Sequence, residues 1–122
     1  TGQDKPFDLS IDDTSVYFTL AQKGQLMKVS KTGGAVTKIA SGLAPSARIA
    51  ADAKGIVTTA AAVGSDGTEM LVFMGSDGSS PTPLASIARN HSADAVALDE
   101  KCVYWASYNP DTRKATLYSR AR

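Results

Sequence analysis

Short apolar segments separated by tight polar turns recur along this chain. Three segments share one pattern, in which an apolar run ends at an aspartate, three turn residues follow, and a β-branched residue opens the next run. The shared residues are Asp12, Asp52 and Asp99, which lie 40 (12 to 52) and 47 (52 to 99) residues apart. Self-similarity at a period of this length is typical of a repeat architecture.

Each copy predicts an antiparallel meander of strands. The hairpin around the aspartate supplies two strands, third strands are predicted at 25–30, 69–74 and 115–120, and fourth strands at 35–40 and 82–85. Pro81 and Pro83 lack N–H donors, which places the last of these at a sheet edge. Helical periodicity is absent, apart from an ambiguous alanine-rich run at 60–63. The pattern predicts an all-β fold of eleven strands.

Repeats of this size and strand content predict a partial β-propeller with three antiparallel blades, at about 6–45, 46–89 and 90–122. The third blade lacks its outer strand. Closed propellers need about four to eight blades, so three blades leave an apolar face open at each end. We therefore expect a partner that covers these faces: either a second copy of the chain, completing a six-bladed ring, or the remainder of a longer propeller.

The turn after each aspartate has a definite chemistry. The carboxylates of Asp12, Asp52 and Asp99 are expected to accept hydrogen bonds from backbone N–H groups further along the turn. The last turn position holds Ser15, Gly55 or Cys102, all small. Glycine there predicts a positive φ or a crowded site, and Cys102 is interpreted as a small turn residue rather than a reactive thiol.

These segments carry a resemblance. The stretches "IDDTSVYFT", "LDEKCVYWAS" and "GQLMKVSKTGGAVTKIASGLAP" resemble blades of bacterial propellers with "VYWT"-type repeats, which are similar to NHL-repeat and TolB-like propellers. The second copy departs, with Val57 and Thr58 where the others have aromatic residues. The resemblance implies a propeller that is often six-bladed and often exported to the periplasm or beyond. It implies little about function.

Composition excludes several classes of function. The net charge of +1 gives no reason to expect nucleic acid or an anionic membrane as partner. No apolar run is long enough to span a membrane as a helix, and one cysteine allows no intrachain disulfide. We expect no metal and no cofactor, because "GSDGTE" and "GSDGSS" lack calcium-loop spacing and no helix follows Gly33 and Gly34.

Candidate functional residues gather at one predicted face. In a meander, the loops between second and third strands and the connections between blades open on the same side, and loops on a rigid scaffold tend to carry binding sites. Tyr108 is expected in such a loop as an exposed aromatic contact. The residues expected in or beside the connections, near the central channel, are Asp8, Arg48, Asn90, His91 and Asp94.

The leading hypothesis is a non-catalytic propeller that binds a protein, a glycan or a small ligand at this face. The alternative is a lyase or hydrolase in which His91, the single histidine, acts at the channel mouth. A third interpretation is a purely structural array of blades that mediates assembly.

Overall fold

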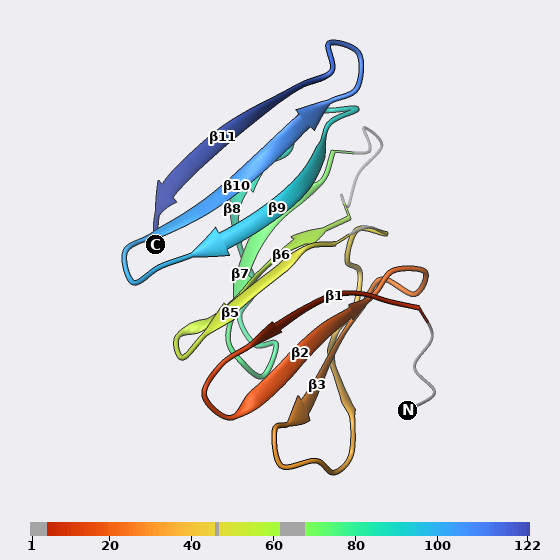
Figure 1. Ribbon diagram of the computed structural model, residues 1–122, viewed down its shortest axis with the longest axis vertical. Coiled ribbons are helices and arrows are strands. Elements are labelled where there is room, and N and C mark those ends of the chain that lie inside the picture. The colour runs from red at the N-terminus through yellow and green to blue at the C-terminus, as the bar shows by residue number, and fades with distance from the viewer. Residues whose placement is uncertain (1–4, 46, 62–67) are drawn as a thin grey trace.

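The chain folds into three antiparallel sheets. The computed structural model describes residues 5–45, 47–61 and 68–122, and its eleven strands form sheets of 4, 4 and 3 strands (Figure 1). Across these described ranges there is no helix, and hence none that could cross a membrane. The predicted all-β fold is confirmed, including the three-stranded last blade.

Each sheet is a meander whose strands pair in chain order. Blade 1 consists of β1 (Pro6–Ile11), β2 (Ser15–Leu20), β3 (Gln25–Ser30) and β4 (Thr37–Ala40). Blade 2 consists of β5 (Ile49–Asp52), β6 (Gly55–Ala60), β7 (Met70–Met74) and β8 (Thr82–Ser86). Blade 3 consists of β9 (Ser92–Leu98), β10 (Cys102–Asn109) and β11 (Lys114–Ala121).

The fourth strands agree less closely with their predicted residue ranges than the other strands do. Strand β4 begins at Thr37 rather than at residue 35, because Gly33 and Gly34 have positive φ and keep the chain in a turn before pairing resumes. Strand β8 is an edge of its sheet, as the prolines predict, and its pairing with β7 is interrupted between Leu71 and Val72.

The three aspartates occupy equivalent turns. In each turn, one carboxylate oxygen accepts the N–H groups two and three residues further on, at 2.7–3.2 Å. The pairs Ser10–Tyr17, Ala50–Val57 and Ala97–Tyr104 stand in register at the same distance from the aspartate. The predicted alignment of the repeats is therefore confirmed.

Gly55 shows why the last turn position must be small. Its φ is 153°, and a Cβ added there would lie 2.3 Å from the carbonyl oxygen of Met74 and 2.7 Å from the ring of Phe73. The position is both conformationally unusual and crowded, as the sequence predicted.

The second oxygen of each turn aspartate has a partner that differs between blades. The Tyr17 hydroxyl donates to Asp12 at 2.7 Å, and the Tyr104 hydroxyl donates to Asp99 at 2.9 Å. Blade 2 has Val57 at the matching position, so it offers no hydroxyl. The guanidinium of Arg122, from the end of blade 3, bonds to both Asp52 oxygens instead, and it also donates to the Asp99 carbonyl at 2.7 Å.

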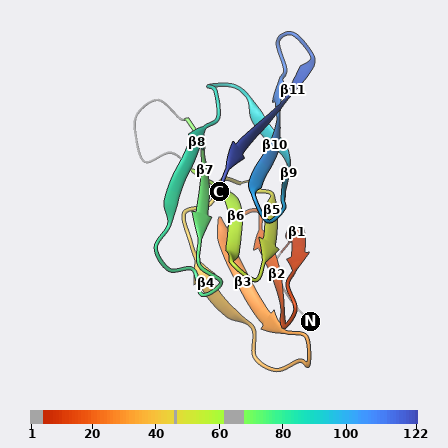
Figure 2. The ribbon, with the colours of Figure 1, turned by 90° about the vertical axis from the view of Figure 1, so that its left-hand side faces the viewer.

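The blades pack face to face, with the middle sheet between the other two (Figures 1 and 2). One apolar cluster joins Tyr17 and Leu26 of blade 1 to the facing side of blade 2, and a second joins Val57 and Leu71 of blade 2 to Trp105 and its neighbours in blade 3. Both clusters contain fully buried side chains. At about 25 cal/mol per Å², this burial is the main force that holds the blades together.

Backbone also approaches backbone between the blades. Gly78, in the turn between β7 and β8, has a φ of 83°, and a Cβ added there would lie 2.0 Å from the carbonyl oxygen of Ile39 in β4. A side chain at this position would force blades 1 and 2 apart.

The Asp12 turn yields a first prediction. Asp12→Ala removes the acceptor of two turn N–H groups and of the buried Tyr17 hydroxyl, so it should lower the free energy of unfolding by about 2 kcal/mol. The exposed neighbour gives a matched control, since Asp13→Ala should change little. Urea unfolding monitored by circular dichroism measures both, and equal effects of the two variants would contradict the assigned role.

The Arg122 contact yields a second prediction. The hydrogen bonds from Arg122 lower the pKa of Asp52, so the contact stabilises the fold above the ordinary pKa of an aspartate and is lost as pH falls through the lowered value. Arg122→Met should raise the pKa of Asp52 and lower the free energy of unfolding by about 1 kcal/mol near neutral pH.

The difference in the free energy of unfolding between Arg122→Met and the unsubstituted chain should shrink on acidification, because protonated Asp52 no longer attracts Arg122. Carboxyl chemical shifts followed by NMR report the pKa, and an unchanged pKa of Asp52 in Arg122→Met would contradict the contact.

Candidate binding pocket at the loop face

A pocket of about 390 Å³ lies where the three blades meet on the loop side. Blade 1 supplies Phe7, the loop before β7 of blade 2 supplies Glu69, and blade 3 supplies one segment of β9. The full lining of the pocket is Phe7, Pro45, Arg48, Glu69, Ser92, Ala93 and Asp94. Because residues from all three blades contribute, the pocket exists only when the blades are packed together.

The pocket belongs to the face that carries the inter-blade connections. Hydrogen bonds hold these connections beside the loops between second and third strands: Leu43 N–H donates to Gly24 O at 3.0 Å, and Ile87 N–H donates to Glu69 O at 2.8 Å. His91 lies at the same end, beside Ser107 near the end of β10. The expectation that His91 and these loops share one face is confirmed, apart from residues 62–67, which include Asp66 and lie outside the described residues.

The first strands of blades 1 and 3, β1 and β9, each pair irregularly with their neighbour, and this directs side chains toward the pocket. Between β9 and β10, Ala106 pairs with Ala95 but Ser107 pairs with Ala93, so Asp94 is the extra residue of a bulge. Pairing between β1 and β2 shifts in the same way between Pro6 and Leu9. Bulges turn a side chain away from its regular alternation and are common beside functional sites. Here they bring Phe7 and Asp94 to the pocket.

The pocket contains charged groups of both signs. The Arg48 guanidinium lies over the ring of Phe7, 4.7 Å from its centre, which is a favourable cation–π arrangement. Burial raises the pKa of Glu69, and Asp94 accepts a hydrogen bond from Ser92 at 2.7 Å. A guanidinium over an aromatic ring, with two carboxyl groups lining the same pocket, suits a polar ligand that itself carries charge.

The predicted residues divide into two groups. Arg48 and Asp94 line the pocket, whereas Asp8, His91 and Tyr108 do not. Asp8 joins two blades: its carboxylate accepts the N–H of Ile49 in β5 at 3.0 Å and the N–H of Leu9 at 3.0 Å. These bonds tie β1 to β5, which is a structural role that the sequence analysis did not assign.

His91 contacts a hydroxyl group but has little of the geometry of a catalytic centre. Asn90 has a φ of 65°, and His91 N–H donates to Ala88 O at 2.9 Å, which closes the turn before β9. Its Nδ1 lies 3.2 Å from the Ser107 Oγ. Ser107 is only 5% exposed, so its hydroxyl lacks the access that an attacking nucleophile needs.

The expected position of Tyr108 was wrong. It lies within β10, paired with Ala115 and Ser92, and is half-buried rather than exposed in a loop. Strand β10 extends to Asn109, where the asparagine side chain accepts the N–H groups of Asp111 and Thr112 and starts the turn. An asparagine directly before the polar turn at 110–113 was the signal for this later strand end.

Sequence reasoning missed five of the seven pocket residues, namely Phe7, Pro45, Glu69, Ser92 and Ala93. Phe7 stands five residues before Asp12, as Asp94 stands before Asp99, so the repeat alignment itself relates the two positions. Glu69 is the last residue of "GSDGTE", which the sequence analysis considered only for calcium, and it directly precedes β7. Among the described residues no group of three or more His, Cys, Asp and Glu side chains gathers as metal ligands would.

Comparisons with known proteins support the fold. No family model matches the chain, and no curated protein matches it significantly. Among solved structures it is similar to a chain in the crystal structure of a nidogen/laminin complex, with 21% sequence identity and a TM-score of 0.66. The match covers 92% of this chain and 47% of that one, so this chain spans about half the length of that β-propeller.

Proposed function

We propose that this chain is part of a non-catalytic β-propeller binding module, and that its loop-face pocket holds a charged segment of a protein ligand. The observation that carries the proposal is the convergence of Arg48, Glu69 and Asp94 on one pocket built from all three blades. A volume of about 390 Å³ lies within the range of roughly 300–1,000 Å³ of ligand sites.

Charge and similarity favour a peptide segment over a neutral glycan. A ligand with both an acidic and a basic group would meet the Arg48 guanidinium and the two carboxyl groups at once, and charged hydrogen bonds give such recognition its strength. The similar nidogen chain was solved in complex with another protein, laminin. Export, and membership of the NHL-like or TolB-like propellers, remain part of this proposal, since they rest on the resemblance of the repeats.

An enzyme remains the second candidate because His91 contacts a serine hydroxyl. A lyase or hydrolase would need His91 to reach substrate from the channel mouth. The low exposure of Ser107, and the absence of His91 from the pocket lining, favour binding over catalysis.

A ligand screen tests the binding site. The ¹⁵N-labelled protein is titrated with the dipeptides Lys-Glu and Arg-Asp and with glucose as a neutral probe, and backbone amide shifts are followed by NMR. We expect a dipeptide to shift amides near Arg48, Glu69 and Asp94, and Arg48→Ala to weaken its binding by about 10- to 100-fold. Arg89→Ala, which removes an exposed arginine outside the pocket, is the matched control.

Loss of binding in both arginine variants would point to a nonspecific effect of charge. Shifts confined to other parts of the chain would contradict the pocket assignment.

The enzyme alternative has its own test. If the chain is a binding module, His91→Ala should leave dipeptide binding within about twofold, because a residue outside the pocket has no direct contact to lose. A panel of ester, glycoside and lactone substrates should give no turnover above buffer with the unsubstituted chain. Turnover that His91→Ala abolishes would overturn the proposal in favour of an enzyme.

A further inference from the structure

The charged groups of the loop-face pocket are not paired with one another. Within residues 5–45, 47–61 and 68–122, no ion pair joins Arg48 to Glu69 or to Asp94, although all three line the pocket. Charges that are partly removed from water are usually paired. Here the two signs are held apart, so each of them remains accessible to a ligand group of the opposite sign.

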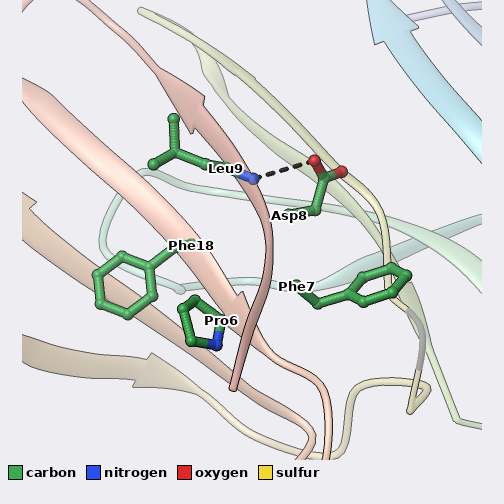
Figure 3. A pocket seen from close by; sticks show the side chains of 5 residues that line it. All are labelled: Pro6, Phe7, Asp8, Leu9 and Phe18. Atoms are coloured by element: carbon green, nitrogen blue, oxygen red, sulfur yellow. Dashed lines mark hydrogen bonds between the residues drawn. The ribbon is translucent and has the colours of Figure 1, made fainter. Parts of the chain in front are cut away.

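The positive end of the pocket lies beside blade 1. Pairing of β1 with β2 is irregular near its start, and Figure 3 shows Phe7 and Asp8 together on one side of β1, opposite to Leu9. The Arg48 guanidinium lies over the Phe7 ring, 4.7 Å from its centre. This contact covers one flat side of the guanidinium and leaves its N–H groups, which lie in the plane, for a ligand.

Asp8 is committed to the backbone rather than to Arg48. Its carboxylate accepts the N–H groups of Ile49 and Leu9, both at 3.0 Å, and it forms no ion pair with Arg48 in the part of the chain that the structure describes. The planar fork of a guanidinium matches the two oxygens of a carboxylate. The positive end of the pocket therefore suits an acidic side chain of the ligand.

The negative end lies at the boundary of blades 2 and 3. Glu69 precedes β7, and its carbonyl oxygen accepts the N–H of Ile87, in the connection that leads to blade 3, at 2.8 Å. Asp94 reaches the pocket from the bulge in β9. Strand β5 lies between β1 and β9 (Figure 1). The two signs of charge are therefore separated along the direction that runs from blade 1 to blade 3.

Glu69 is the strongest reason to expect a cation in the ligand. Its side chain is half-buried, burial raises the pKa of its carboxyl group, and no hydrogen-bond or ion-pair partner among the described residues offsets this cost. A cation brought by the ligand would offset it. The carboxylate of Asp94 has room for further donors. Pro45 and Ala93, in the same lining, suit the methylene groups of a long basic side chain.

We propose, building on the function proposed above, that the pocket sets the direction in which its ligand binds. An acidic side chain of the bound segment meets Arg48 beside blade 1, and a basic side chain meets Glu69 and Asp94 at the boundary of blades 2 and 3. A segment bound in the opposite direction would place like charges together at both ends, which disfavours that orientation.

A double-mutant cycle between protein and ligand tests this direction. The probe is acetyl-Lys-Glu-amide, and its two analogues carry norleucine in place of the lysine or glutamine in place of the glutamate. Glu69→Gln should weaken binding of the probe by about 10-fold but that of the norleucine analogue by less than about twofold, because only the probe loses a charge partner. Arg48→Met should weaken the probe by about 10-fold and the glutamine analogue by less than about twofold. Backbone amide shifts measured by NMR report each affinity.

Two further variants complete the cycle. Asp94→Asn removes the charge of an exposed side chain and should give the same pattern as Glu69→Gln. Glu100→Gln is the matched control, because Glu100 is exposed and lies outside the pocket; it should change the affinity for all three ligands by less than about twofold. The amide spectra also show whether each variant keeps its fold, and if Glu69→Gln unfolds, Asp94→Asn decides in its place.

The possible outcomes separate this inference from the proposed function. Equal effects of the carboxyl variants on the probe and on the norleucine analogue would refute the basic end. Coupling of Arg48 to the lysine of the probe, rather than to its glutamate, would refute the direction. In both cases the probes would still bind in the pocket, and the proposed function would stand. If none of them shifts the amides of the pocket lining, the proposed function fails, and the direction fails with it.

Discussion

The structure depends on one constraint: a blade has two faces that need cover, and a single sheet cannot cover both. Blade 2 alone has a neighbour on each side, and its central strand β6 is buried almost throughout, with Ile56 and Val57 at 0% exposure. The outer blades meet this requirement on one side only. Sheet-to-sheet packing therefore orders the array, and it also creates the pocket, whose walls come from three different blades.

The turn aspartates contribute at a second level. One carboxylate oxygen accepts hydrogen bonds from N–H groups of the same turn, so the turn needs no partner from the rest of the fold. The other oxygen is left for a partner that the blade context decides. Tyrosines fill this role within blades 1 and 3, whereas Arg122 fills it for blade 2 and so joins the second and third blades electrostatically. A change from tyrosine to Val57 within one blade is thus compensated from another.

The sequence was sufficient for what local chemistry decides. The Asp-centred hairpins, the strand order and the small Gly55 position all follow from residues that lie close together in the chain. It was insufficient where pairing slips by one residue or where partners are distant. The bulge at Asp94 depends on how β9 meets β10, and the Arg122–Asp52 bond spans 70 residues. Tyr108 was misplaced because the turn signal at Asn109 was not used to extend the strand to its end.

The close approach of Gly78 to Ile39 also has a consequence for curvature. This contact lies between the fourth strand of one blade and the turn before the fourth strand of the next, far from the first strands, and it permits almost no spacing between the two backbones. The separation of blades at this periphery, relative to their separation at the hub, fixes the angular width that each blade occupies. Any side chain at position 78 would widen that angle, and a wider angle lets fewer blades complete a full turn. A single hydrogen atom in place of a side chain thus helps to set the blade number that the array can adopt.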